Sequence, residues 1–264
     1  MLKIWLIGAT SKVGQELRKL LDIREIELLE TDLEEIDITN LEEVHRYMHM
    51  TRPEIIINCA NAKESATVDD MFKVNAIAPK NISIVSNAIN AKLIHLSSYE
   101  VFPVTQDIVY QEFDTPIPDT IYGKSKLAGE EFIKNFTNKY IIIRRGQTYT
   151  GFVQQVIDAC HSNTPISAAS NQYIQLTSPK STAKLIFDML PCKDYGTYHA
   201  TTTGVPSQYE IAVEIVRILN SSVTIEKIDN LLESYKAVDN FMLRLTQNYT
   251  MPTWQEGLTE YLMA

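Results

Sequence analysis

The feature that most constrains the fold of this chain is a glycine-containing turn near its start. An apolar run at residues 2–7 (LKIWLI) ends at Gly8, and apolar residues then recur at helical spacing over residues 13–21 (VGQELRKLL). This pattern predicts a buried strand, a tight turn and an amphipathic helix. Gly8 allows the sharp turn, and Gly14 allows the helix to pack closely on the strand. The helix N-terminus would offer amide donors to an anionic group, although any α/β protein can contain a glycine turn.

Short apolar runs and helical segments alternate through the first half of the chain. Further strands are predicted at residues 26–29, 55–57, 93–96 and 140–144, and helices at residues 39–48, 74–91 and 122–136. The first of these helices is expected to start at a capping box formed by Thr39 and Glu42. Because strands that alternate with helices form parallel sheets, the expected fold class is α/β, with a doubly wound parallel (Rossmann) sheet.

The second half has longer segments and lacks such glycine turns. Helices are predicted at residues 151–162, 180–190, 207–219 and 253–262, and strands at residues 174–177 and 197–200. We therefore expect a dinucleotide-binding domain made of residues 1–150 and roughly 174–200. Residues 151–173 and 201–264 would form a smaller C-terminal α/β substrate-binding lobe.

Polar residues are expected at the carboxyl edge of this sheet, where open parallel sheets bind their ligands. Ser97 and Ser98 end one predicted strand, and a long loop leads into a helix on which Tyr122 and Lys126 stand four residues apart on one face. Alone, the Tyr-x-x-x-Lys spacing arises by chance in a chain with 13 tyrosines, and a serine pair is more often a turn. Together with the glycine turn and the small residues Cys59-Ala60-Asn61, the pattern favours a dinucleotide-dependent proton-transfer site.

Acidic residues crowd the segment where a Rossmann fold meets the adenosine ribose of its cofactor. They are Glu30, Asp32, Glu34 and Glu35, and no arginine or lysine lies between residues 25 and 38. Because negative charge repels a 2′-phosphate, we expect NADH to be favoured over NADPH. A solvated charge run explains the pattern equally well.

Charge and cysteine content exclude several other classes of protein. The net charge of -9 leaves no basic face for nucleic acid. The three cysteines form no CxxC pair, which argues against a disulfide framework or a zinc site and favours the reducing cytoplasm. No apolar run approaches the roughly 18 residues of a membrane span, so no membrane partner is expected. The five histidines show no ligand spacing, and no metal is assigned.

Four segments together resemble the extended short-chain dehydrogenases, and most closely the dTDP-4-dehydrorhamnose reductases within that family. Besides the glycine turn at residues 8–14, they are residues 96–102 (LSSYEVF), 122–130 (YGKSKLAGE), 196–200 (GTYHA) and 251–258 (MPTWQEGL). The resemblance covers essentially the whole chain. It implies reduction of the C4 keto group of a nucleotide-linked 4-keto-6-deoxysugar, with NADH or NADPH as cofactor, in surface polysaccharide biosynthesis.

The resemblance also implies roles for individual residues. Tyr122 would give a proton to the sugar oxygen, Lys126 would lower the pKa of Tyr122 and hold the nicotinamide ribose, and Ser98 would donate a hydrogen bond to the developing alkoxide. The implied cofactor-binding residues are Gly8, Thr10, Ser11, Lys12, Val13, Gly14, Asp37, Ile38, Cys59, Ala60, Asn61, Asn75, Ser97, Tyr122 and Lys126. The implied substrate-binding residues are Ser98, Tyr99, Glu100, Tyr122 and Gln147.

Departures from the family pattern keep two alternatives open. Ser11 replaces the middle glycine of the loop, and residues 145–147 (RGQ) replace the usual Thr-Ser-Trp. Glu100 stands where the reductases usually have tyrosine, and a glutamate near this point resembles the sugar-nucleotide dehydratases. The alternatives are therefore a dehydratase or epimerase of the same family, or a non-catalytic dinucleotide-binding regulatory subunit. The oligomeric state stays open, with a homodimer as one outcome.

Overall fold

The computed structural model describes residues 1–63, 65–105, 108–247 and 249–263. Its centre is a six-stranded sheet with the strand order β2-β1-β3-β4-β6-β9. The strands are β1 (Leu2–Ile7), β2 (Ile26–Thr31), β3 (Ile55–Asn58), β4 (Lys92–Ser98), β6 (Tyr140–Arg145) and β9 (Gly196–Ala200). All neighbouring strands pair in parallel, so their carboxyl ends share one edge of the sheet. The predicted α/β class with a doubly wound parallel sheet is confirmed.

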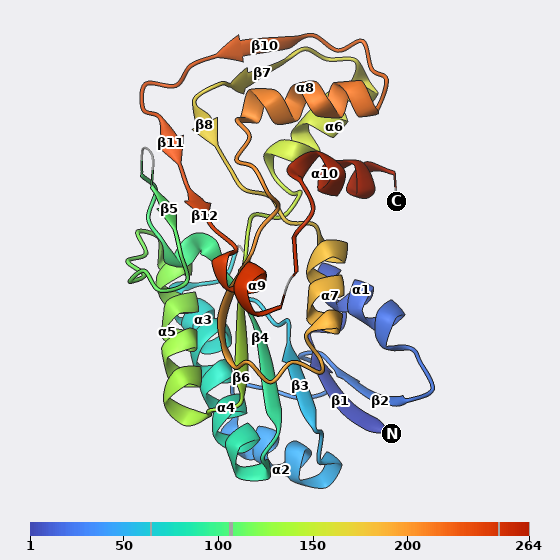
Figure 1. Ribbon diagram of the computed structural model, residues 1–264, viewed down its shortest axis with the longest axis vertical. Coiled ribbons are helices and arrows are strands. Elements are labelled where there is room, and N and C mark those ends of the chain that lie inside the picture. The colour runs from blue at the N-terminus through green and yellow to red at the C-terminus, as the bar shows by residue number, and fades with distance from the viewer. Residues whose placement is uncertain (64, 106–107, 248, 264) are drawn as a thin grey trace.

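Helices cover both faces of this sheet (Figure 1). One face carries α1 (Lys12–Leu21) and α7 (Pro179–Asp188), and the other carries α2 (Leu41–Thr51), α4 (Ala78–Ile89) and α5 (Ile121–Phe136). Successive side chains of a strand point to opposite faces. Leu6 of β1 is accordingly buried with Leu17 of α1, whereas the adjacent Trp5 is buried with Met48 of α2. In the described ranges, no helix is long and apolar enough to cross a membrane.

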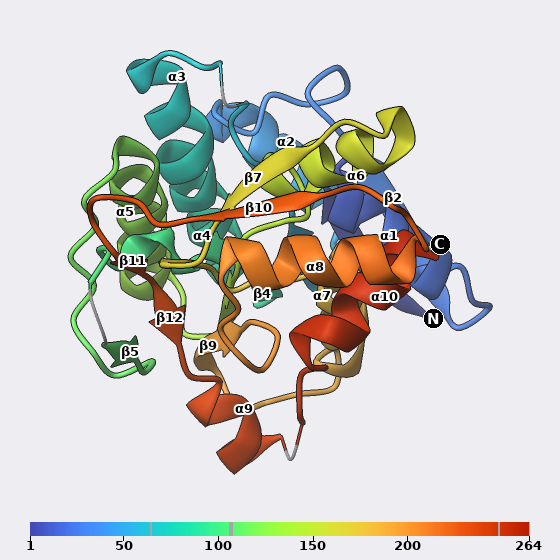
Figure 2. The ribbon, with the colours of Figure 1, turned by 90° about the horizontal axis from the view of Figure 1, so that it is seen from above.

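A smaller lobe stands beyond the carboxyl edge of the sheet (Figures 1 and 2). Its helices are α6 (Phe152–Ser162), α8 (Gln208–Ile218) and α10 (Trp254–Leu262), and its strands are β7 (Ile166–Ala169), β8 (Gln172–Tyr173), β10 (Ile225–Ile228) and β11 (Ser234–Tyr235). Strand β7 pairs with β10, and β8 pairs with β11. Val156, Ile211 and Leu258, one from each helix, are fully buried in a hydrophobic cluster that is separate from the clusters on the two faces of the main sheet.

The chain returns from this lobe to the sheet before its last helix. Strand β12 (Ala237–Val238) pairs with β5 (Val109–Tyr110), and α9 (Phe241–Thr246) follows. Leu243 of α9 is fully buried in the cluster formed by α1, α7 and the main sheet. Residues 237–246 therefore connect the lobe to the main sheet.

Two local predictions are wrong. Helix α2 starts after Asn40, whose Oδ1 accepts hydrogen bonds from the amides of Glu42 and Glu43, whereas the Thr39 hydroxyl donates to Asp37 at 2.7 Å. Both residues are good caps, and the one nearer to the helix takes the position. Residues 174–177 form no regular strand, because they cross from the lobe to the sheet with a single bridge between Leu176 and Gln147.

Candidate active site

The N-terminus of α1 faces the carboxyl edge with free amide donors. The Ser11 hydroxyl accepts from the Gly14 amide at 3.0 Å and caps the helix. The amides of Lys12 and Val13 have no acceptor among the described residues. A Cβ on Gly14 would lie 2.3 Å from the Gly8 carbonyl oxygen, so only glycine allows this close packing. Serine at the middle loop position thus serves as a helix cap and leaves two amides for an anionic group.

A cleft of about 840 Å³ runs from this loop across the ends of β1, β2 and β3. Of the residues expected to bind cofactor, it is lined by Gly8, Thr10, Ser11, Ile38, Cys59, Ala60 and Asn61. Its far end is acidic: Asp32, Glu34 and Glu35 line it, and the Asp32 carboxylate accepts a hydrogen bond from the Thr10 amide at 3.0 Å. Glu30 lies outside the cleft, where its carboxylate pairs with Arg18 at 2.8 Å. The cleft and the free amides fit a dinucleotide.

Helix α5 brings Tyr122 to the same edge. Thr120 caps the helix, and Gly123 lets it approach the turn after β4, because a Cβ there would lie 2.1 Å from the Glu100 carbonyl oxygen. The Tyr122 hydroxyl donates to Asn61 Oδ1 at 3.2 Å. Burial raises the pKa of Tyr122 above its ordinary value, while the nearby Arg145 guanidinium and hydrogen bonds to Asn61 and Ser98 act to lower it. The geometry therefore places a phenol beside Ser98 at the strand ends.

Lys126 lies one turn further along α5 and is almost completely buried. Its Nζ donates to the Leu96 carbonyl oxygen of β4 at 2.8 Å. Burial, followed by the charge of Arg145, lowers the pKa of Lys126 to about 7, although Glu130 acts in the opposite direction. The ammonium group is thus fixed behind Tyr122 and titrates near neutral pH.

A buried ion pair holds α5 on the sheet. Glu130 accepts from the Arg144 guanidinium of β6 at 2.7 Å and from the Ser97 hydroxyl of β4 at 2.6 Å. The Glu130 side chain is 0% exposed and that of Arg144 is 2% exposed. Arg144 also stacks on the Phe102 ring, 5.1 Å from its centroid. Ser97 therefore fixes the helix that carries Tyr122, and it also lines a small cavity together with Tyr122.

Asn75 lies behind the cleft and lines neither it nor the smaller cavity at Tyr122. The predicted helix at residues 74–91 consists of a π-helical segment (Lys73–Ile77) followed by α4, and the short helix α3 (Val68–Phe72) precedes them. In that segment Asn75 accepts from the Ala62 amide at 3.1 Å and donates to the Ser125 hydroxyl at 3.0 Å. Asn75 thus joins the loop after β3 to α5. Short π-helical segments such as this one are frequent at functional sites.

The remaining expected residues lie at the rim or beneath it. Asp37 is held by Thr39 and Glu43, and it lines neither the cleft nor the smaller cavity at Tyr122. Gln147 makes main-chain hydrogen bonds to Gln175 and Thr177. Ser98, 7% exposed, accepts from the Glu100 amide.

Tyr99 and Glu100, both expected to bind substrate, face the lobe. Tyr99 is 2% exposed and packs with Val101 and Phe102. The Glu100 carboxylate accepts from Lys236 Nζ at 2.8 Å, and the Lys236 side chain is only 6% exposed. Sequence reasoning missed Lys236, since no local signal connects residues 136 positions apart.

Arg145 is the other functional candidate, and the sequence pattern marked it only as part of the departure at residues 145–147. It lines a cavity of about 180 Å³ that also contains Lys12, Tyr122 and Lys126 and shares Ser11 with the larger cleft. Its position at the end of a buried strand, like that of Ser98, is the signal that could have identified it.

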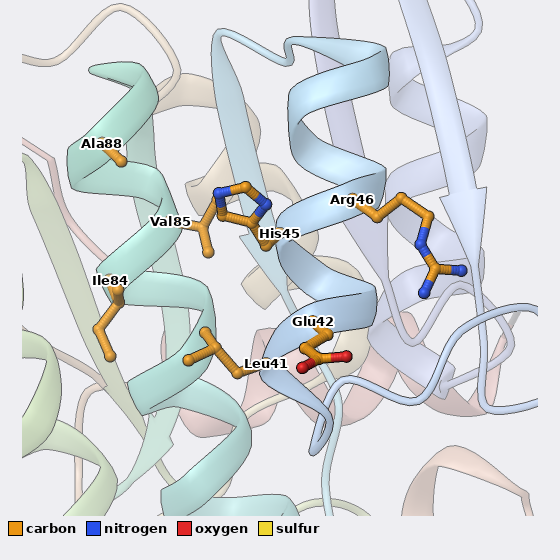
Figure 3. A pocket seen from close by; sticks show the side chains of 7 residues that line it. All are labelled: Leu41, Glu42, His45, Arg46, Ile84, Val85 and Ala88. Atoms are coloured by element: carbon orange, nitrogen blue, oxygen red, sulfur yellow. The ribbon is translucent and has the colours of Figure 1, made fainter.

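A second hollow lies on the helical layer between α2 and α4 (Figure 3). There, Leu41 and His45 point toward Ile84 and Val85, whereas Arg46 points away. The hollow shares no residue with the cleft at the strand ends. Nor does any group of three or more histidine, cysteine or acidic residues in the described part of the chain form a metal site.

Comparison with known proteins finds relatives that match over the whole chain. The family model described as RmlD substrate binding domain matches residues 2–264. The spore coat polysaccharide biosynthesis protein SpsK of Bacillus subtilis is 27% identical, with 99% of this chain and 97% of that protein covered. A dTDP-4-dehydrorhamnose reductase of Escherichia coli is 26% identical, again with 99% and 97% covered. The crystal structure of dTDP-4-dehydrorhamnose reductase from Bacillus anthracis in complex with NADP is 31% identical, with a TM-score of 0.93 and coverage of 100% and 98%.

Proposed function

The chain belongs to the RmlD substrate binding domain family and is an NAD(P)-dependent oxidoreductase of the extended short-chain dehydrogenase type, and from this premise we propose that it reduces the C4 keto group of a nucleotide-linked 4-keto-6-deoxysugar. The observation that carries the proposal is that Tyr122 and Lys126 line one cavity, with Ser98 next to the Tyr122 hydroxyl, beside a cleft that fits a dinucleotide. The lobe formed by residues 151–173 and 201–264 would hold the nucleotide sugar.

The chemistry follows from the arrangement of these side chains. The dinucleotide, when bound, supplies a hydride to the carbonyl carbon, and the C=O π electrons move to the sugar oxygen. Tyr122 gives its hydroxyl proton to that oxygen, which becomes the alcohol, and the phenolate then regains a proton from water. Ser98 donates a hydrogen bond to the oxygen while negative charge develops on it. Lys126 would hold the cofactor ribose, and its positive charge would favour loss of the Tyr122 proton.

The direct test follows cofactor oxidation with a panel of dTDP-, GDP-, UDP- and CDP-linked 4-keto-6-deoxysugars, with NADH and NADPH in parallel. We expect one nucleotide class to be turned over far faster than the others. Release of water from a 4-hydroxy sugar nucleotide, without cofactor oxidation by any keto sugar, would instead identify a dehydratase. Cofactor binding without turnover of any sugar nucleotide would support the dinucleotide-binding regulatory subunit, and failure to bind either cofactor would overturn the reductase.

The Glu100–Lys236 ion pair favours a reductase over a dehydratase. A dehydratase needs a carboxylate that is free to accept a proton, whereas the Glu100 carboxylate is held by a buried ammonium group. We expect the double variant Glu100→Gln/Lys236→Met, which removes both charges, to keep kcat for ketone reduction within about tenfold of wild type, because general acid–base groups contribute about 10²–10⁴-fold. Steady-state kinetics would measure this. A loss of at least about a hundredfold in the folded variant would restore Glu100 as a proton-transfer group.

We also infer a preference for NADH, supported by the acidic end of the cleft. Asp32→Asn keeps an oxygen that can accept from the Thr10 amide and removes only the charge. The change should tighten NADPH binding by about tenfold, since like charges a few ångströms apart near a surface cost about 1–4 kcal/mol. NADH binding should change little. Fluorescence titration with both cofactors would measure the ratio, with Glu30→Gln, outside the cleft, as the matched control.

The cytoplasm is the inferred compartment, supported by three free cysteines, of which Cys59 is buried at the cleft. Size-exclusion chromatography with light scattering would distinguish a homodimer from a monomer.

A further inference from the structure

Arg145 and Arg144 are adjacent on β6 and have opposite electrostatic surroundings. Arg144 is paired with Glu130 in the core. Arg145 has no carboxylate partner within salt-bridge distance among the described residues, and its recorded hydrogen bond goes from Nη1 to its neighbour Gly146 O at 3.3 Å. Removing a guanidinium partly from water without an anion is costly. A charge kept unpaired at the end of a buried strand therefore suggests a functional role.

The position of Arg145 connects it to the proton-transfer site. In the sheet register it is the direct partner of Ser98 on β4. It lines the small cavity together with Tyr122, Lys126 and Lys12, and none of the residues that line this cavity is acidic. In a chain with a net charge of -9, this is a local concentration of three basic side chains.

At neutral pH a smaller fraction of Lys126 than of Arg145 is positively charged. Its ammonium group is bound to the Leu96 carbonyl oxygen, and burial lowers the pKa of Lys126 to about 7, so only part of the population is charged at neutral pH. A guanidinium stays protonated under the same conditions. The charge of Arg145 further lowers the pKa of Lys126 and also acts to lower that of Tyr122.

We propose that Arg145 is a positioning residue of the proton-transfer site, whose permanent charge stabilises the Tyr122 phenolate left when the proton has moved to the sugar oxygen. This inference rests on the proposed function for its place in the reaction. The electrostatic effect of Arg145 on the Tyr122 phenol, however, is a property of the protein that can be measured without substrate or cofactor.

Other groups around the phenol are neutral or compensated. Cys59 lies at the end of β3, and burial raises its pKa to about 12, which keeps it a thiol. Tyr99, after β4, also has its pKa raised by burial and stays neutral. Glu100 acts to raise the pKa of Tyr122, but its charge is paired with Lys236. Among the residues that line the small cavity, Arg145 is the basic group left besides Lys12 of α1 and the titrating Lys126.

The test measures the titration of Tyr122 by ¹⁹F NMR in protein labelled with 3-fluorotyrosine, whose ring fluorine makes the phenol more acidic. The Tyr122 resonance is assigned by its absence in Tyr122→Phe. Arg145→Gln should raise the midpoint by about 1 pH unit or more, as expected when an adjacent opposite charge is removed. Arg145→Lys should stay near wild type because it keeps the charge. Arg46→Gln, which removes an exposed charge on α2, should leave the midpoint unchanged.

Arg145→Thr is a second uncharged variant in case the glutamine variant does not fold. A wild-type midpoint in either folded uncharged variant would overturn the proposal, and so would an equal shift in Arg145→Lys, because shape rather than charge would then be responsible. The titration uses neither substrate nor cofactor, so a failed sugar-nucleotide assay leaves this result standing. With an active enzyme, the alkaline limit of kcat should rise in parallel, since reduction needs the protonated phenol.

Discussion

Replacing Tyr122 with phenylalanine is expected to lower kcat for reduction of a 4-keto sugar nucleotide by about 10²- to 10⁴-fold, the usual contribution of a positioned proton donor. The variant loses the hydroxyl and keeps the ring, so α5 and its packing stay in place. The hydroxyl donates to the side chain of Asn61, which lines the cleft, at 3.2 Å. Cofactor affinity should therefore change by much less than the rate. Steady-state cofactor oxidation and cofactor fluorescence measure the two quantities separately.

Tyr195→Phe is the matched control for this experiment. Tyr195 is 39% exposed, precedes β9 and lines neither cavity at the site. The same loss of a hydroxyl should leave kcat within about twofold of wild type, since surface changes away from special features have small effects. Full turnover by Tyr122→Phe would remove Tyr122 from its role as the acid. An equal loss in both variants would point to a general effect of losing tyrosine hydroxyls.

The predictable parts of the site are those whose residues are close in sequence. The glycine loop follows a strand and opens a helix within seven residues, and Tyr122 and Lys126 need only one helical turn to share a face. Their meeting with Ser98 follows from the rule that parallel strands end at one edge. These features required no knowledge of packing, and the structure brings Ser98 and Tyr122 together as that rule implies.

The parts that could not be predicted depend on partners distant in sequence. Glu100 looked like a free base because nothing near it in sequence shows that Lys236 would bind it. Arg145 stood out in the sequence only as part of the departure at residues 145–147, because the lack of a carboxylate partner depends on every neighbour in space. The lobe strands β8 and β11 contain two residues each, too few to show a period. The position of Asn75 depends on the π-helical segment, which propensity rules do not predict.

The Glu130–Arg144 pair shows how the core fixes the position of the proton donor. Both charges lie out of water between α5 and β6, and Ser97 of β4 completes the contact at 2.6 Å. Because a buried charge without its partner is strongly unfavourable, the helix cannot shift along the sheet without breaking this contact. Tyr122 stands two turns earlier on the same helix. The ion pair therefore connects core stability to the geometry of the reaction.

Glu130→Gln is accordingly expected to lower the free energy of unfolding by about 3–5 kcal/mol, because it leaves Arg144 buried and unpaired. Urea unfolding followed by circular dichroism measures the change. Glu131→Gln is a neighbouring control: Glu131 is 55% exposed and pairs with Lys134 at 2.9 Å, so its loss should cost about 0–1 kcal/mol. The double variant Glu130→Leu/Arg144→Met removes both charges and should recover much of the lost stability. If Glu130→Gln cost no more than Glu131→Gln, the pair would contribute nothing to holding α5. The position of Tyr122 would then have to depend on the other contacts of α5, namely the close approach at Gly123 and the hydrogen bonds of Lys126 and Ser125.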